Sequence, residues 1–407
     1  MNTRLRNTGF AAFFFSGICA ISSGIVVSLL QQKYGFNYAV TGTLLSLMGI
    51  GNMLAAFIAG FWPRKIGMRL TILIMSCGYA VGYFVMTLTG VVGALMVMFF
   101  LVGIAKGSVL NCCSVLVGQN STDSVKGMNI MHACYATGAL ACPFIIMALT
   151  CISIDAPMIG ISVCGICLWI LFFMAKLPGK DSAAPKGKSE GQSDAGNAVT
   201  DDAKSKAGAG EQKAASEKAF FKDGIFWLLT FMIFCQNAAE TSVNGWMVTY
   251  YKDQSILSGT LSNYTVTVMW AATLIGRLLI AFVLPIRNNY KALLIMGMGS
   301  TVCYGFLVNA SSPWPAIITL SLFAFSMAGV NPMSTGLVGK NLSPECMGVL
   351  LPIGSLGAII MPWIIGIVSD NVGLKMGMCM NLIPCVGLLI ISSVLLIKSD
   401  KAPGVSK

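Results

Sequence analysis

Long apolar stretches recur along the whole sequence, and they limit the possible folds of this chain more than any other feature. Each is about 20 residues long, which is the length that a helix needs to cross the hydrocarbon core of a bilayer. Inside a bilayer the backbone polar groups must be paired within the chain, so such stretches form helices. We predict an all-α membrane protein with twelve transmembrane helices, near 8–30, 39–61, 70–88, 92–118, 127–150, 156–175, 224–250, 259–284, 291–309, 315–337, 345–368 and 373–397.

A polar segment divides these spans into two groups of six. Between residues 176 and 222 the chain consists mainly of Lys, Ser, Gly, Ala, Asp and Glu, with almost no bulky apolar side chain. Such a segment cannot bury a core, so we predict that it is disordered. The expected organisation is an N-terminal six-helix half at 1–175, a disordered cytoplasmic linker at 176–222 and a C-terminal six-helix half at 223–407.

The basic residues indicate how the chain lies in the membrane. They gather at the N-terminus, in the linker and in alternate loops, as at Arg64 and Lys65, whereas the loops of the other side hold Lys33, Lys252 and Lys375. Cytoplasmic loops carry an excess of Lys and Arg, so this asymmetry predicts a cell (inner) membrane protein with both termini in the cytoplasm. The topology accounts for the net charge of +11, and we do not expect nucleic acid as a partner.

The composition and motifs also exclude several classes of protein. Hydrophobic residues make up 56% of the chain and charged residues only 10%, whereas a soluble domain carries about 25% charged residues. The phosphate-binding pattern GxxxxGK[ST] does not occur, so no ATP-driven motor is expected. The one histidine, His132, has no cluster of further ligands that would make a metal site. We therefore expect neither an enzyme nor a cofactor or metal.

The two predicted halves resemble each other in sequence. GNMLAAF at 51–57 matches GRLLIAF at 276–282 at Gly, Leu, Ala and Phe, and Gly-Ala with a following Pro occurs at 138–143 and again at 357–362. The matches keep their order and a nearly constant offset. Because each half has six helices, both halves have the same topology, which is the parallel repeat of a major facilitator. In such proteins the binding site lies between the halves, near the middle of the membrane.

The loop after the second predicted span carries a family signature. In GFWPRKIGMR, residues Gly60, Lys65, Gly67 and Arg69 fit the pattern G-x-L-a-D-r-x-G-r-r, while Arg64 stands in place of its Asp. Across both halves the chain resembles the major facilitator superfamily. The resemblance implies two six-helix bundles that transport a solute by alternating access.

Within that superfamily, the chain is similar to the fucose:proton symporter family of sugar permeases. Three features carry this resemblance: Gly107 with Asn111, Asn129-Ile-Met-His132 followed by Gly138-Ala139 and Pro143, and Glu240 followed by Trp246 and Tyr250. It implies symport of a sugar with a proton. The fucose permease has membrane carboxylates in its first and fourth helices, whereas this chain has none in its first half and carries Lys106 in the fourth span.

Polar residues form a stripe on the span near 224–250. Gln236, Glu240 and Asn244 repeat every four residues and so share one helix face, with Asn237 beside them. A carboxylate inside a membrane is normally paired, protonated or turned towards a water-filled cavity, and it marks a functional site by default. We predict that these four residues bind substrate and that Glu240 couples transport to protons. The alternative is a stripe of hydrogen bonds between helices.

Three basic residues lie in or beside the predicted spans. Lys106 is near the middle of the fourth span, so it is a candidate for substrate binding and for proton coupling, either as a switchable partner of Glu240 or as its static ion pair. His132 is a further candidate for proton coupling, or a structural hydrogen-bonding residue. Arg277 is interpreted as a residue that reaches to the membrane surface or lies on the gate side with hydrogen bonds to helix ends, or alternatively as an anion clamp.

Other polar and aromatic residues complete the predicted site. Asn331-Pro332 interrupts the tenth span, and backbone carbonyls freed in this way are tolerated where they line a cavity or meet a donor from another helix. Asn111 is polar, and Tyr135, Trp246 and Trp270 suit stacking on a sugar, although aromatic residues in membranes also serve as packing or interfacial residues. These four residues and Asn331 are predicted to bind substrate.

Three functions agree with these features. The first is a proton-coupled importer of a sugar or similar small polar solute, acting as a monomer in the lipid bilayer. The second is an organic-anion or carboxylate carrier, because two cations face one carboxylate within the spans. The third is a membrane receptor or scaffold that does not transport.

Overall fold

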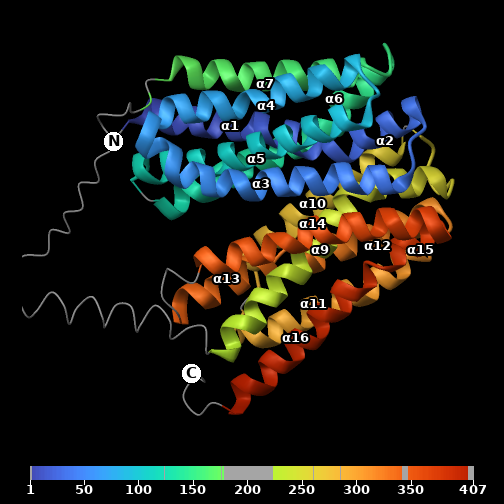
Figure 1. Cartoon of the computed structure of the whole chain (residues 1–407). Coiled ribbons are helices and arrows are strands. Elements are labelled where there is room, and N and C mark those ends of the chain that lie inside the picture. Colours follow the sequence, from blue (N-terminus) through green and yellow to red (C-terminus); the bar gives the residue numbers. More distant parts are fainter. Residues whose placement is uncertain are drawn as a thin grey trace, which may run out of the picture.

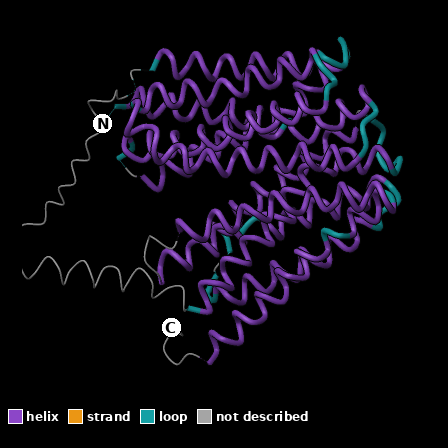
Figure 2. Tube along the Cα trace, viewed as in Figure 1, coloured by secondary structure: helices purple, strands orange, loops and turns teal. Residues whose placement is uncertain are grey.

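The structure of the chain is a computed structural model that describes residues 2–122, 124–175, 177, 223–259, 261–284, 286–341 and 347–401. The predicted linker and the last residues of the chain lie outside this part, apart from 177. The described residues form helices joined by short loops, most of which lie at the ends of the bundle, while a few interrupt a crossing inside it (Figure 2).

Six membrane crossings make up the N-terminal half. The first crossing consists of two consecutive helices, and each of the others is a single helix: α1 (Thr3–Ile21) and α2 (Ser23–Tyr34), then α3 (Tyr38–Ile66), α4 (Met68–Leu88), α5 (Val92–Asn120), α6 (Ser124–Thr150) and α7 (Ala156–Met174). All six crossings are long and apolar enough to span a membrane.

Six further crossings make up the C-terminal half. They are α9 (Gly224–Asp253), η3 (Leu261–Asn263) with α10 (Tyr264–Phe282), α11 (Asn289–Val308), α12 (Pro313–Met327) with α13 (Val330–Asn341), α14 (Met347–Val372), and α15 (Leu374–Cys379) with α16 (Leu382–Lys401). Only α9 is too polar to qualify as a span by hydropathy, because Gln236, Asn237 and Glu240 interrupt its apolar run. Its 30 residues, about 45 Å of helix, are still long enough to cross. The predicted fold class, twelve transmembrane helices in two six-helix halves, is confirmed.

The internal repeat predicts an equivalent helix contact in each half. A Cβ atom at Gly138 of α6 would lie 2.1 Å from the carbonyl oxygen of Phe14 on α1, and one at Gly357 of α14 would lie 2.0 Å from that of Phe234 on α9. Both distances are far below van der Waals contact, so each helix pair can approach this closely only with glycine. The matching glycines therefore have the same packing role in the two halves.

The two halves meet through three helix pairs, α3 with α14, α6 with α10 and α2 with α9. At the end of the bundle away from the termini, Asp370 accepts hydrogen bonds from the backbone N–H groups of Tyr38 (2.7 Å) and Ala39 (2.9 Å), at the start of α3. The hydroxyl of Tyr38 donates to Asp253 at 2.5 Å. A carboxylate at a helix N-terminus is favourable because the unpaired N–H groups and the helix dipole both attract it.

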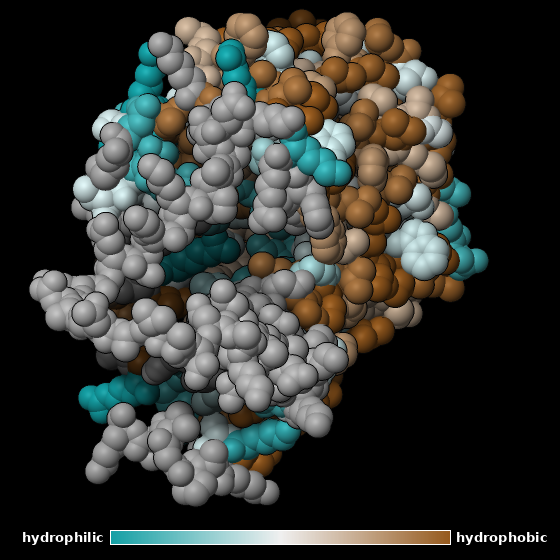
Figure 3. Space-filling view, turned by 60° about the vertical axis from the view of Figure 1, so that its left-hand side comes forward, coloured by the Kyte–Doolittle hydropathy of each residue, from teal (hydrophilic) through white to brown (hydrophobic). Residues whose placement is uncertain are grey.

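At the opposite end the halves diverge. Figure 1 shows α13 and the start of α9 well separated from α3 and α5 on the side where both termini lie. The space-filling view turned towards this end shows hydrophilic side chains in the recess between the halves (Figure 3). The structure is therefore closed on one side of the membrane and open towards the side of the termini.

Candidate functional site

The tenth crossing is broken where the sequence predicts an interruption. Helix α12 ends at Met327 and α13 begins at Val330, so Ala328 and Gly329 lie in a turn between them. Pro332 has no N–H group and cannot donate to the carbonyl oxygen four residues earlier, which belongs to Ala328. Instead, Nε of Arg277 on α10 donates to this oxygen at 3.4 Å. The break thus fixes a charged side chain of a neighbouring helix.

The same break is connected to the polar stripe on α9. Nδ2 of Asn331 donates to Oε1 of Gln236 at 3.2 Å, and Nε2 of Gln236 donates to Oε2 of Glu240. Gln236 is buried, while Glu240 remains half-buried although it lies far from both ends of its helix. Partial exposure at this depth indicates that Glu240 faces the recess between the halves.

Three charged side chains interact at this level of the bundle. The Glu240 carboxylate lies within electrostatic range of both Arg277 and Lys106. Among the described residues, the one ion pair within 4.0 Å joins Lys33 to Asp155, elsewhere in the N-terminal half. The static Lys106–Glu240 ion pair considered from the sequence is therefore not formed. Arg277, for which the sequence suggested a hydrogen bond to a helix end, makes one to Ala328 at the end of α12, and it is also electrostatically coupled to Glu240.

An aromatic chain connects the two halves beside these charges. The ring of Phe13 on α1 packs edge-on against His132 and also contacts Tyr135, with centroids 5.6 Å and 5.2 Å apart. Tyr135 on α6 contacts Trp270 on α10 at 5.7 Å. His132 and Tyr135 both lie within electrostatic range of Arg277. Nε1 of Trp270 is buried and has no hydrogen-bond partner among the described residues, so it is free to donate to a ligand.

Other predicted site residues serve to hold helices together. Trp246 is fully buried, and its Nε1 donates to the carbonyl oxygen of Pro362 at 3.2 Å. Asn237 donates to the carbonyl oxygen of Gly354 at 3.1 Å, so both residues connect α9 to α14. We therefore remove them from the candidate site. The assignment of Trp246 from the sequence neglected its direction: it is six residues after Glu240 and so lies on another helix face.

Two asparagines hydrogen-bond within their own helices. Asn111 donates to the carbonyl oxygen of Gly107 at 2.7 Å, and Asn244 donates to that of Glu240 at 3.1 Å. Oδ1 of Asn244 is buried without a partner in the described part of the chain, so Asn244 keeps an acceptor for a ligand. Among the described residues, the hydrogen bond of the Asn111 side chain goes to its own helix and not to the charged side chains.

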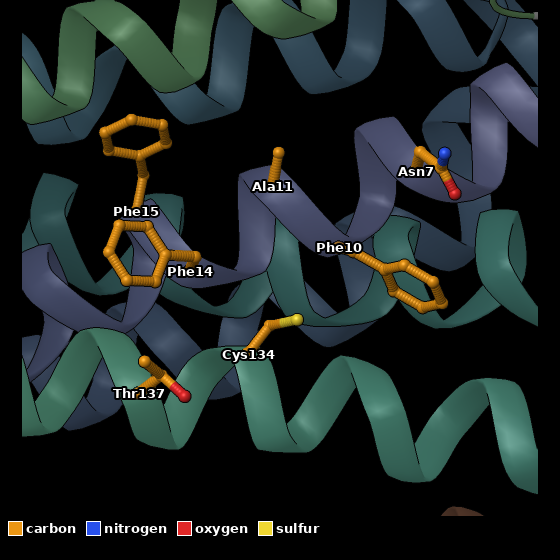
Figure 4. Close-up of a pocket in the computed structure, with 7 residues that line it drawn as sticks. All are labelled: Asn7, Phe10, Ala11, Phe14, Phe15, Cys134 and Thr137. Carbon is orange, nitrogen blue, oxygen red and sulfur yellow. The ribbon is translucent and has the colours of Figure 1, made fainter.

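A separate pocket lies on another face of α1. Its volume is about 550 Å³, and its lining residues are Asn7, Phe10, Ala11, Phe14, Phe15, Cys134 and Thr137. Figure 4 shows this lining, which comes from α1 and α6 and contains no charged side chain. Phe13, which contacts His132 and Tyr135, is not part of it. The pocket is thus mainly apolar and distinct from the polar site.

The chain belongs to the Major Facilitator Superfamily, since the sequence model of that family matches residues 8–353. It is thus a membrane transporter of this superfamily. An uncharacterized MFS-type transporter of Yersinia pestis is 22% identical over 387 residues, which cover 94% of this chain and 92% of the relative. The match is to the superfamily as a whole, so it does not identify the fucose:proton symporter family.

Solved structures share the fold. The nucleoside transporter NupG, crystallised as a mutant, superimposes with a TM-score of 0.76 at 12% identity, covering 97% of this chain and 99% of NupG. A bacterial homologue of the human lysosomal transporter Spinster, described as inward-facing and unoccupied, gives a TM-score of 0.70 at 13% identity and covers 97% and 96% of the two chains. At such identities the similarity concerns the fold alone.

Proposed function

We propose that this transporter is a proton-coupled symporter that imports a small polar solute, such as a sugar, by alternating access. The observation that carries the proposal is the electrostatic coupling of Glu240 on the C-terminal half to Lys106 of the N-terminal half and to Arg277 of its own half, beside the recess between the halves. Charged groups inside a membrane are costly and mark substrate or proton pathways. Both halves contribute to the site, so rocking one half against the other would expose it to alternate sides.

We further propose that the protein is a monomer in the inner membrane of the cell. Both of its termini would lie in the cytoplasm. The basic residues of the terminal side support this orientation. In it, the present structure is open to the cytoplasm, and the hydrogen bonds of Asp370 and Asp253 close the outer side.

Glu240 is the proposed proton-coupling residue. It is the one acidic residue of the polar site in the described part of the chain. Arg277 and Lys106 are its electrostatic neighbours, and because Lys106 belongs to the other half, its effect on the proton of Glu240 would change as the halves move. Gln236 fixes one of its oxygens, which leaves the other for a proton or for a hydroxyl group of the solute. Lys106 and His132 are proposed to assist, and Tyr135 and Trp270 to provide the surface on which a ring packs.

A thermal-shift screen of the purified protein tests the proposal. A solute that binds only the folded protein stabilises it, by about 2.7 kcal/mol at one hundred times its Kd. We expect one class to raise the melting temperature within a panel of sugars, hexuronates, amino acids, dicarboxylates and nucleosides. We also expect Glu240→Ala to lose that shift. If no compound stabilises the wild type and none is taken up, the chain is better described as a receptor or scaffold that has kept the fold.

A further inference from the structure

We infer that the solute carries a carboxylate and that Arg277 binds it end-on, through the two terminal nitrogens of its guanidinium group. This inference rests on the proposed function and names the substrate class of the same site. It is carried by the way in which the broken tenth crossing holds Arg277.

The hydrogen bond to Ala328 orients the guanidinium group. It uses Nε alone, and within the described residues neither terminal nitrogen has a hydrogen-bond partner. The side chain of Arg277 is also exposed. A guanidinium group held in this way presents its two terminal nitrogens together, and that pair matches the two oxygens of a carboxylate.

The charges of the site leave room for an anion. Lys106 and Arg277 bring two positive charges, and Glu240 brings one negative charge that Gln236 already engages. Neither cation has an ion-pair partner within 4.0 Å in the described part of the chain. When Glu240 takes up a proton in the transport cycle, both cations lack a counter-charge. A carboxylate on the solute supplies that counter-charge, so an acid and a proton are expected to bind together.

The aromatic surface lies next to the same arginine. Tyr135 and Trp270 are in contact, Trp270 is on the same helix as Arg277 two turns away, and its buried Nε1 still lacks an acceptor. A carboxylate joined to a ring with hydroxyl groups would meet Arg277 at one end and the aromatic pair at the other. Sugar acids have this chemistry, and neutral sugars lack the anionic end.

Matched acid and neutral probes test the inference on the purified full-length protein. The pairs are D-glucuronate with D-glucose, D-galacturonate with D-galactose, and nicotinate with nicotinamide, each at the same concentration in a thermal-shift assay. We expect the acid of one pair to stabilise the wild type and its neutral partner to have no effect. Arg277→Gln should weaken acid binding by at least about tenfold. Arg277→Lys should weaken it less, since a lysine keeps the positive charge but lacks the two terminal nitrogens that bind both carboxylate oxygens.

Two further variants separate recognition from folding and from bulk charge. Pro332→Ala returns an N–H donor to the Ala328 carbonyl and so competes with Arg277, which keeps its charge. We expect this variant to fold and to bind the acid more weakly than the wild type. Arg287→Gln removes the same charge from the exposed loop after α10 and should bind as the wild type does.

The possible results distinguish this inference from the proposed function. If neutral sugars stabilise the wild type as well as the acids do, or if Arg277→Gln binds the acid unchanged, the inference is overturned while solute transport stands. If none of these probes binds but a neutral compound of the wider panel does, the inference is overturned while the proposed function stands. If nothing in the wider panel binds and none is taken up, both are overturned.

Discussion

The Glu240→Gln variant is expected to exchange labelled solute across the membrane and to lose uphill accumulation. Glutamine keeps the shape of the side chain and an oxygen that can accept the hydrogen bond from Gln236, but it cannot take up and release a proton. Exchange requires only that the loaded carrier rocks, whereas accumulation requires proton release inside. For one proton per solute, one pH unit supports about tenfold accumulation, because it corresponds to about 1.4 kcal/mol. In the variant the inside and outside concentrations should become equal.

A matched control uses the same chemical change away from the recess. Asp155 pairs with Lys33 at 2.6 Å, so Asp155→Asn also replaces a carboxylate by an amide and should still accumulate solute. Accumulation by Glu240→Gln at the wild-type level would show that Glu240 does not couple protons. If exchange also disappears while the variant stays folded, Glu240 is better explained as a direct ligand of the solute.

The second large effect is expected from Gly42→Leu, at the closed end of the bundle. A Cβ atom at Gly42 of α3 would lie 2.6 Å from the carbonyl oxygen of Pro362 and 3.1 Å from Cα of Gly366, both on α14. A leucine there prevents the halves from closing on this side. Overpacking costs about 1–3 kcal/mol, which shifts the equilibrium away from the present structure by about 5-fold to about 150-fold and should reduce transport within that range.

Hydrogen–deuterium exchange detects the altered state directly. Peptides that cover 34–42 and 366–373 should exchange faster in Gly42→Leu than in the wild type, since the hydrogen bonds from Tyr38 and Ala39 to Asp370 are lost. Gly305→Leu is the matched control, because a Cβ atom at Gly305 meets nothing within 4 Å. If Gly42→Leu transports solute and exchanges its amide hydrogens as the wild type does, the contact of α3 with α14 at Gly42 is not the closed gate.

The fold could be predicted from the sequence because it depends on local properties. Apolar length defines the crossings, and the polar stripe at Gln236, Glu240 and Asn244 is visible from its helical spacing alone. The interruption at Pro332 was also predictable, since a missing N–H group acts on its own helix. These features need no knowledge of which helices are neighbours.

The partners of these residues could not be predicted, because they depend on packing between distant segments. Arg277 donates to the Ala328 carbonyl oxygen that Pro332 leaves without a donor. This hydrogen bond depends on the packing of α10 against α12, and its two residues are 51 positions apart in sequence. Asp370 and Tyr38, which close one end, are 332 residues apart in sequence. In the sequence, Asp370 is only an acidic residue just beyond a predicted span. The fold is what brings it, at the end of α14, next to the start of α3.

Coupled proton movement tests the central claim most directly. Proteoliposomes that contain a pH-sensitive dye, with the membrane potential clamped and no initial pH gradient, would receive the stabilising solute on the outside. A symporter carries protons inward with the solute, so the wild type should acidify the lumen in proportion to solute uptake, and Glu240→Gln should take up solute without acidification. Uptake by the wild type with no change in lumenal pH would contradict the account.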